Sequence, residues 1–414
     1  MAKNNNSNSV AKNTTMLYIM NITKIVLPLV TLPYLTRVLS KTGYGTVNYV
    51  KAVMQYVQMT VDFGFLLSAT KDVILVKDDK DALCRVVGDT LLAKLILLAA
   101  SFVVVAGLTT LIPLLRANPL FTFLSFVVVG LTCFLMDFLF RGLEEMQVIT
   151  MRYVVMRLIA AALTFVFVKS DADILWIPVL DILGSLVAIV LVFWEMKKRA
   201  ISIKFTGLKS ALKKLHDSAI FFVSNMATTT FTALNTILIG IFIDTQHVAE
   251  WTLCMQMVSA VQAMYTPVTD GIYPYMVKSR DWKLIRKATM IFMPIIFAGC
   301  VFTFFAARLA LVILGGEKYA SAVPLLRAFI PLLFFSFPAM LYGWPALGSI
   351  GKSKETTRTT VTTAGIQIAG LVILLLLNQF TVINLAILRG TTELFMLAMR
   401  YGYCRKFMSE FANT

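Results

Sequence analysis

Long apolar runs recur along this chain and are separated by short polar segments. About 20 apolar residues in helical conformation span the hydrocarbon core of a bilayer. Because lipid offers no hydrogen bonds to the backbone, each run predicts a transmembrane α-helix. The pattern predicts twelve spans, near residues 16–38, 45–69, 86–113, 119–140, 148–168, 173–196, 217–242, 249–277, 288–314, 323–348, 358–379 and 382–404. A very short turn between Asn378 and Asn384 separates the last two.

Composition supports an all-α integral membrane protein. Hydrophobic residues make up 58% of the chain and charged residues 14%, whereas soluble domains carry about 25% charged residues. The five cysteines do not form a metal-ligand spacing, and only two histidines occur. We therefore expect reduced, packed cysteines, with no disulfide framework, metal or cofactor.

The distribution of basic residues predicts the topology. The loops on the side of the N-terminus hold 26 Lys and Arg residues, and the loops on the opposite side hold five. The positive-inside rule then places both termini in the cytoplasm, in agreement with an even number of spans. The net charge of +16 is accounted for mainly by this asymmetry, so nucleic acid is not expected as a partner.

The longest and most basic connection divides the chain into two halves of six spans. We expect a flexible cytoplasmic N-terminus at 1–15, bundles at 16–196 and 217–404, a linker at 197–216, and a cytoplasmic tail at 405–414. The linker contains LKSALKKL, which fits either an amphipathic surface helix or a plain connection. Asp-Phe-Gly at 62–64 and Asp-Gly at 270–271 indicate a weak internal repeat.

Several spans carry a polar face. Lys51, Gln55, Gln58 and Asp62 fall within one narrow sector of the second span at helical spacing. Such a face must avoid lipid, so it either packs against other helices or lines a wet cavity. Two charges favour the cavity here; for the seventh and eighth spans the two interpretations are equal. Similar stripes comprise Asn21, Lys24, Pro28 and Thr31, then Asn225, Thr228, Thr229, Thr232 and Thr236, and then Gln256, Ser259, Thr266 and Asp270.

Charges inside the spans need partners. Lys24 and Asp62 are expected at similar depth on adjacent antiparallel spans, and we predict that they pair. Arg389 and Glu393 are four residues apart and predict an ion pair within one helix. The remaining arginines have no obvious partner and either reach the surface or serve a site: Arg157, Arg308 and Arg327.

The first predicted hairpin resembles that of a known family. Pro33-Tyr34-Leu35-Thr36-Arg37-Val38-Leu39, Tyr44-Gly45, Asn48-Tyr49 and Asp62-Phe63-Gly64 are similar to the signature of the polysaccharide flippases. These are the Wzx/O-antigen translocases of the multidrug/oligosaccharidyl-lipid/polysaccharide exporter (MOP) superfamily. Ser40 departs from the family, which has Gly after Arg-Val-Leu.

The resemblance implies two pseudo-symmetric six-helix bundles around a central cavity, lined by spans 1, 2, 7 and 8. It implies a substrate, an undecaprenyl-diphosphate-linked oligosaccharide, that moves from the cytoplasmic to the periplasmic leaflet of the bacterial inner membrane. Basic side chains suit its diphosphate. The candidate substrate contacts are Asn21, Lys24, Lys51, Gln55, Asn225, Arg308 and Arg327, and the candidate coupling groups for a proton or sodium ion are Asp62 and Asp270.

Two other classes of protein stay open. A multidrug or cation antiporter of the same superfamily would have an acidic or aromatic cavity, whereas acidic and basic residues are mixed here. A membrane glycosyltransferase or polymerase would need catalytic groups in a sizeable outer loop, and the outer loops are short. We therefore expect a transporter and not an enzyme, with membrane lipid around it and a polysaccharide polymerase as a candidate partner.

Overall fold

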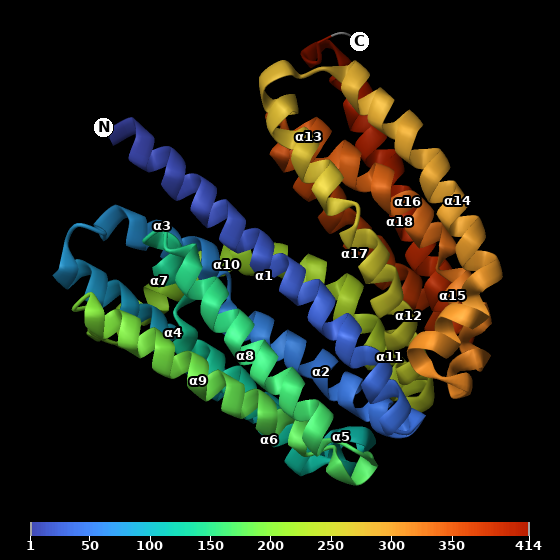
Figure 1. The fold of residues 1–414 in the computed structure, drawn as a ribbon, viewed down its shortest axis with the longest axis horizontal. Helices are drawn as coiled ribbons and strands as arrows, with labels where there is room; N and C mark the ends of the chain where they lie inside the picture. Colours follow the sequence, from blue (N-terminus) through green and yellow to red (C-terminus); the bar gives the residue numbers. More distant parts are fainter. Residues whose placement is uncertain (1, 413–414) are drawn as a thin grey trace. The chain divides into compact units, whose positions relative to one another are not determined.

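The computed structural model describes residues 2–412, without the side chains of 2–12, 14, 220, 223–225, 227, 228 and 230. Within this part the regular structure is helical, apart from one isolated bridge between Asp281 and Ala412. The chain forms two compact units, Met1–Thr229 and Thr230–Thr414. Figure 1 shows the helices of both units, which are described separately below. The predicted all-α class is confirmed.

The first unit contains ten α-helices among the described residues. The helix α8 packs against α1 on one side and α9 on the other, while α2 packs against α4 and α6 (Figure 1). The bounds are α1 Ala2–Val38, α2 Lys41–Asp62, α3 Phe65–Val76, α4 Lys80–Leu111, α5 Pro113–Ala117, α6 Pro119–Thr132, α7 Asp137–Gly142, α8 Met146–Phe167, α9 Trp176–Lys198 and α10 Leu208–Thr229. The helix α1 therefore extends into the predicted flexible N-terminus.

The second unit is organised around α18, which packs against α15, α16 and α17. Two π-helical turns interrupt its helices, at Thr230–Leu234 and at Tyr342–Gly348, the latter called η5. The bounds are α11 Asn235–Phe242, α12 Thr245–Ala263, α13 Thr266–Ser279, α14 Trp282–Gly315, α15 Val323–Ala328, α16 Ile330–Leu341, α17 Ser353–Leu376 and α18 Val382–Lys406.

Nine helical segments in the described residues are long and apolar enough to cross a membrane. The other three predicted spans, 45–69, 217–242 and 249–277, coincide with helices that are broken or carry polar residues. The break between α2 and α3 lies at Phe63 and Gly64, whose φ angles are 39° and 80°. Together with the span at 16–38, which does qualify, these three segments are the ones that the resemblance assigns to the cavity wall.

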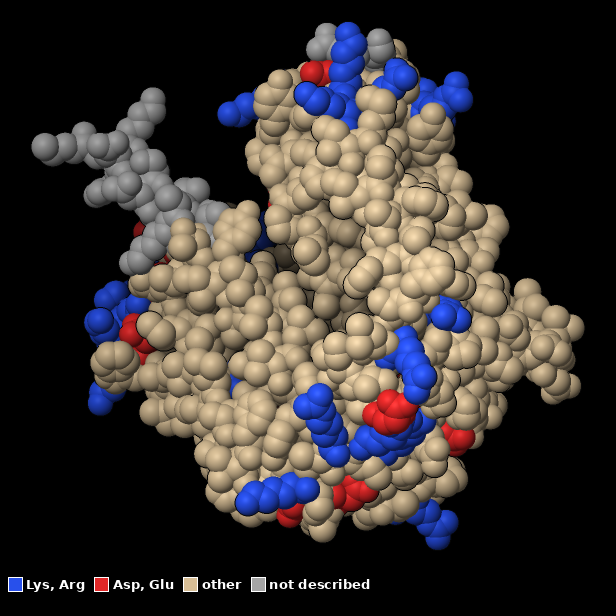
Figure 2. Space-filling view, turned by 45° about the vertical axis from the view of Figure 1, so that its right-hand side comes forward, with Lys and Arg blue, Asp and Glu red and all other residues tan. Residues whose placement is uncertain are grey.

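The flanks of both units are apolar, as a protein in lipid requires. In the second unit, α14 exposes large side chains along its length, including Ile295, Phe302 and Phe305. Figure 2 shows Lys and Arg gathered at the end of this unit that holds the C-terminus, next to an almost uncharged flank. The burial of neutral Thr side chains against their own helix carbonyls, as at Thr109 and Thr164, fits the same environment.

The turn of the first hairpin is shorter than the sequence predicted. The predicted spans at 16–38 and 45–69 leave residues 39–44 between them, but α2 already begins at Lys41. Ser40 caps this helix by accepting a hydrogen bond from the Gly43 N–H at 2.9 Å, and its own N–H donates to Asp171 at 2.8 Å. A Cβ on Gly43 would lie 2.1 Å from the Asp171 carboxylate. The departure from glycine at position 40 therefore supplies a helix cap.

The linker between α9 and α10 is bound to α4. Buried Asp89 accepts hydrogen bonds from the N–H and the hydroxyl of Thr206, at 2.8 and 2.9 Å, and from Ser210. The Lys204 N–H donates to the Cys84 carbonyl at 3.2 Å. The LKSALKKL segment forms the first turns of α10, which packs against α2, α3 and α4. It is thus part of a long helix and not a separate surface helix.

Gly88 allows this docking, and its replacement by alanine should release the linker. A Cβ at Gly88 would lie 2.1 Å from the Lys204 carbonyl oxygen, a backbone atom that cannot move away alone. We expect Gly88→Ala to lower the free energy of unfolding by about 1–3 kcal/mol, measured by thermal unfolding in detergent. Gly107→Ala, on the same helix with no atom within 4 Å, is the control and should be neutral or stabilising. Equal melting temperatures for the two variants would contradict this account.

The C-terminal segment ties together one end of the second unit. Ala412 donates its N–H to the Arg280 carbonyl at 2.8 Å and accepts from the Trp282 N–H at 3.0 Å. Glu410 pairs with Lys352 at 2.8 Å. The segment thus connects the turn between α13 and α14 with the start of α17.

Candidate functional site

A cavity of about 380 Å³ opens among α1, α2, α6, α8 and α9 of the first unit. Its wall is mostly apolar, with Leu27, Met54 and Phe121 among its members. The charged side chains in the wall are Lys51, Arg157 and Asp181. Its volume lies within the range of small-molecule sites, about 300–1,000 Å³, and its charged wall residues carry a net positive charge.

Tyr153 organises the cations of this cavity. Its ring lies 5.3 Å from the Lys24 ammonium and 5.8 Å from the Arg157 guanidinium, so both cations face one aromatic side chain. Arg157 also pairs with Asp181 at 3.4 Å. Lys51 interacts electrostatically with both members of that pair. Two cations and one carboxylate thus line the cavity, and a third cation, Lys24, lies against Tyr153 of its wall. This arrangement can bind an anion through charge-assisted hydrogen bonds.

Arg157 has no obvious partner in the sequence, but in the structure it pairs with Asp181. A charge on a membrane-spanning helix is costly unless it has a partner or contacts water. The spacing of the two residues, on α8 and α9, gave no local signal, because they are neighbours only through the packing of those helices. Arg157 is thus paired with Asp181, whereas Lys51 and Lys24 have no ion-pair partner among the described residues.

The predicted pair of Lys24 with Asp62 is wrong. Asp62 accepts a hydrogen bond from Lys94 at 2.8 Å and another from Gln58 at 2.7 Å. Gln58 is also bonded to Thr132 at 3.0 Å, which links α2 to α4 and α6. The carboxylate is therefore held beside the break between α2 and α3, outside the cavity that Lys51 lines.

Two further predicted contacts of the first unit do not line this cavity. Asn21 and Gln55 are exposed on α1 and α2 and are not part of its wall. The side chain of Asn225 lies outside the described residues. Their assignment as substrate contacts therefore stays a prediction.

Two predicted contacts in the second unit lie near the ends of α14 and α15. Arg308 pairs with Glu317 at 2.7 Å, and both side chains are about two-thirds exposed or more, at 71% and 67%. Arg327 donates to the Phe304 carbonyl at 3.0 Å and lies 4.4 Å from the Phe304 ring. Neither residue lines a cavity described here, which fits the alternative that they reach the surface.

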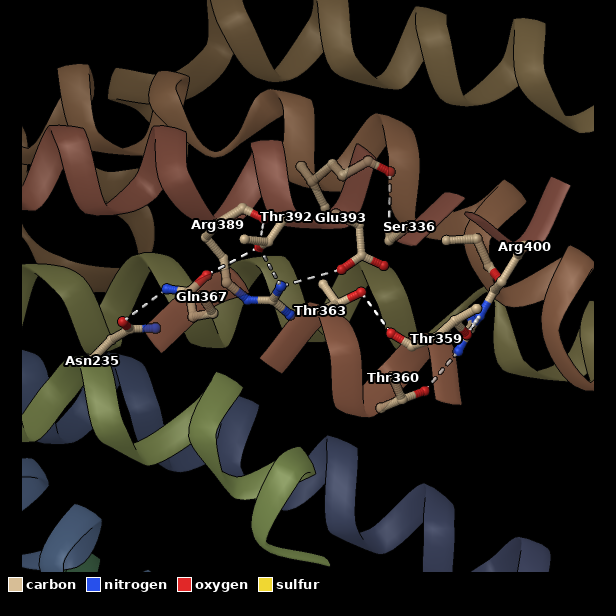
Figure 3. Close-up of polar contacts among 12 residues, drawn as sticks. Asn235, Ser336, Thr359, Thr360, Thr363, Gln367, Arg389, Thr392, Glu393 and Arg400 are labelled. Carbon is tan, nitrogen blue, oxygen red and sulfur yellow. Dashed lines mark hydrogen bonds and ion pairs between the residues drawn. The ribbon is translucent and has the colours of Figure 1, made fainter. Parts of the chain in front are cut away.

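A chain of hydrogen bonds runs through the interior of the second unit (Figure 3). Gln367 of α17 donates to Asn235 of α11 at 3.2 Å and accepts from Thr392 of α18 at 3.0 Å. Arg389 pairs with Glu393 at 3.2 Å, which confirms the predicted pair within one helix. Both side chains are buried, and the pair joins the network that holds α11, α17 and α18 together.

Arg400 is a second buried cation of this unit. Its guanidinium donates to the Ala339 carbonyl at 2.7 Å, to Thr359 at 3.2 Å and to Thr360 at 3.0 Å (Figure 3). The Ala339 carbonyl lies close to the point where the backbone leaves the helical conformation, at Gly343, whose ψ is −109°. Arg400 therefore satisfies an acceptor at the break between α16 and η5.

Asp270 lines a separate cavity of about 340 Å³ in the second unit, among α13, α16, η5 and α18. Arg400 lines the same cavity. Among the described residues the Asp270 carboxylate has no hydrogen-bond or ion-pair partner. An unpaired carboxylate on such a helix marks a functional site. In the described part of the chain there is no cluster of three metal-ligating residues.

Sequence reasoning missed four polar residues of the interior. Lys94, Asp89 and Arg152 were read as apolar-span or loop positions, and Arg400 was counted with a cytoplasmic loop, but all four are buried. Arg152 pairs with Asp137 and donates to the Leu135 carbonyl. The available signal was their position within or next to apolar runs, where a charge requires a buried partner.

Comparison with known proteins identifies a matching family and two relatives of this chain. A family described as "Polysaccharide biosynthesis protein" matches residues 10–280. A protein of Escherichia coli (strain K12) named "Putative O-antigen transporter" is 26% identical over 91% of this chain and 91% of its own length. A protein of the same name from Shigella dysenteriae is 25% identical over 84% of this chain and 88% of its own.

Solved structures share the fold. An inward-facing multidrug resistance MATE family transporter of the MOP superfamily has a TM-score of 0.70 at 13% identity, covering 93% of this chain and 98% of its own. The lipid II flippase MurJ, in an inward closed conformation, has a TM-score of 0.69 at 12% identity, covering 95% and 87%. The chain therefore shares the fold of these two transporters.

Proposed function

We propose, from the premise that this chain belongs to the polysaccharide biosynthesis protein family, that it is a flippase for a lipid-linked oligosaccharide. Its relatives are named transporters and its structural neighbours include a flippase, so the proposal is a transporter and not an enzyme. In more detail, we propose that the oligosaccharide is carried on undecaprenyl diphosphate and moves from the cytoplasmic to the periplasmic leaflet of the inner membrane. Both termini then lie in the cytoplasm.

The single observation that carries the proposal is the basic cavity of the first unit. Lys51 and Arg157 line it, and Lys24 lies against Tyr153 at its edge. A diphosphate always bears negative charge, and ammonium and guanidinium groups bind phosphate through charge-assisted hydrogen bonds. The apolar remainder of the wall excludes competing water, which strengthens these interactions. A multidrug antiporter for cationic compounds would not gain from this charge.

Transport by alternating access requires a step that resets the protein. We assign ion coupling to Asp62, whose carboxylate is bound to Lys94 and Gln58 and is 41% exposed. Protonation of this carboxylate would break its ion pair with Lys94 and so loosen α2 from α4. Asp270 is the second candidate from the sequence, since it lacks a partner among the described residues.

Complementation tests the proposal. In an Escherichia coli strain without its O-antigen flippase, the chain should restore surface O-antigen. Lys51→Ala should reduce the restored polysaccharide at least tenfold at equal protein abundance, because the diphosphate loses a cation of the cavity. Lys77→Ala is the control: Lys77 is exposed at the end of α3 and its loss should change nothing.

The alternative has a distinct outcome. If the strain gains resistance to cationic drugs while its O-antigen stays absent, the chain is an antiporter of the same superfamily. Full activity of Lys51→Ala and Arg157→Ala together would remove the basic cavity from the mechanism.

A further inference from the structure

The cavity that Asp270 lines has a chemistry different from that of the basic cavity. Its wall contains one carboxylate, Asp270, and one guanidinium, Arg400, so its formal charge is zero. The basic cavity has a net positive wall. A neutral wall with two opposite charges offers no net attraction to a diphosphate. It suits a ligand that is uncharged and carries many donors and acceptors.

Two aromatic rings form one side of this cavity. Trp344 and Tyr273 both line it and both border Gly348. A Cβ on Gly348 would lie 2.9 Å from the Trp344 ring and 3.6 Å from the Tyr273 ring, so the absence of a side chain at Gly348 leaves room for both rings. The two side chains are 53% and 36% exposed. Their rings therefore have free surface against which a ligand can stack.

Aromatic residues on membrane helices commonly face the lipid headgroups, but that role does not explain the polar groups beside them. Asp270 has no partner among the described residues, and Arg400 is bound only by neutral acceptors. Neither charge is neutralised by the other, although both line one cavity. Such groups at membrane depth are costly unless a ligand or water satisfies them. Lipid tails could not do so.

A sugar ring matches this combination. One face of a pyranose is a set of C–H groups that stacks on an aromatic ring, and its edge is a set of hydroxyls. The Asp270 carboxylate can accept from hydroxyls, and the remaining N–H groups of Arg400 can donate to hydroxyl oxygens. The cavity volume, about 340 Å³, lies at the small end of ligand sites and is suited to one or two rings.

A neighbouring cavity extends the polar surface. It has a volume of about 370 Å³ and shares Thr266, Met340 and Arg400 with the first one. Its wall adds Gln262 and the buried pair of Arg389 and Glu393. The two cavities thus form adjoining polar pockets within one unit. Additional sugar units of the same chain would meet donors and acceptors there.

We propose that the cavity lined by Trp344, Tyr273, Asp270 and Arg400 is a saccharide-binding subsite that recognises the sugar portion of the substrate. This inference rests on the proposed function and deepens it, since the first unit then binds the diphosphate and the second unit binds the glycan. Asp270 becomes a substrate-binding residue, and ion coupling is left to Asp62. Arg400 then has two roles, because it donates to the Ala339 carbonyl and also to hydroxyl oxygens of the sugar.

The test compares two lipids that differ only in the sugar. The full chain in lipid nanodiscs is titrated with undecaprenyl diphosphate and with undecaprenyl diphosphate bearing N-acetylglucosamine, and binding is followed by native mass spectrometry. The wild type should bind the sugar-bearing lipid more tightly. Trp344→Ala and Asp270→Asn should each weaken that binding about tenfold and leave the affinity for the bare lipid unchanged.

Matched variants make the result specific. Trp344→Phe keeps an aromatic face and should retain most of the gain from the sugar. Tyr275→Ala removes an exposed ring that lies on the same helix as Tyr273 but outside the cavity, and should have no effect. Arg400 is not varied, because its loss would also free the Ala339 carbonyl.

Four outcomes would overturn the proposal. An unchanged preference for the sugar-bearing lipid in Trp344→Ala and Asp270→Asn would show that the sugar binds elsewhere. An equal loss of affinity for both lipids in these variants would show that the two side chains only maintain the fold. If the wild type binds neither lipid, the proposed function itself fails. If Lys51→Ala lowers the affinity for both lipids while Trp344→Ala and Asp270→Asn bind both as the wild type does, only the saccharide subsite fails.

Discussion

Replacement of Glu393 by alanine is expected to lower the free energy of unfolding of the second unit by about 3–5 kcal/mol. Glu393 and Arg389 are both buried, with 5% and 9% of their surfaces exposed. Removal of the carboxylate leaves a buried guanidinium without its ion-pair partner, and the Phe231 ring, 4.4 Å away, offsets only part of that loss. The melting temperature in detergent should fall by about 10 °C.

The control is an ion pair of the same unit that is exposed. Glu317→Ala breaks the pair with Arg308, whose side chains are 67% and 71% exposed, and should cost less than about 1 kcal/mol. The double variant Arg389→Met with Glu393→Leu should recover most of the stability, since an apolar pair of similar size avoids buried charge. If Glu393→Ala costs no more than Glu317→Ala, the pair does not hold the core of this unit.

Replacement of Asp62 by alanine is expected to abolish transport and to destabilise the first unit by about 3 kcal/mol. Lys94 is 9% exposed and would lose its carboxylate, and Gln58 would lose one of its two partners. The stability and the transport effects have different origins in our proposal. Stability depends on pairing of Lys94, whereas transport depends on a carboxylate that can exchange a proton.

A double variant separates these effects. Asp62→Ala with Lys94→Met removes both charges, so protein abundance and melting temperature should return towards the wild type while surface O-antigen stays below about a tenth of normal. Asp78→Ala, at an exposed carboxylate after α3, should leave both readouts unchanged. Restored transport in the double variant would show that the pair is structural and that Asp62 does not couple an ion.

The helical architecture follows from the apolar pattern, because in lipid the backbone has no alternative to internal hydrogen bonds. The predicted spans near 148–168 and 382–404 coincide with α8 and α18 within a few residues. The breaks were not predicted. The left-handed residues Phe63 and Met136 interrupt the spans near 45–69 and 119–140, and neither residue type signals such a conformation.

The site was predicted in part. Lys51 was identified because a lysine on a polar helix face cannot face lipid, and it does line a cavity. Its neighbour Arg157 was identified as a charge without a partner, and its pairing with Asp181 depends on how α8 packs against α9. Periodicity along one helix reports which face is polar. It does not report which other helix meets that face, and this is why Lys94 was missed as the partner of Asp62.

The contacts of Ala412 with Arg280 and Trp282 have a consequence for synthesis. The turn between α13 and α14 leaves the ribosome long before the residue that binds it. Until Ala412 has been synthesised, the Arg280 carbonyl and the Trp282 N–H stay bonded to water at the membrane surface. Insertion of the last helices and closure of this end are therefore late events, and a nascent chain stalled after α18 should be cut by protease near Arg280 more readily than the released protein.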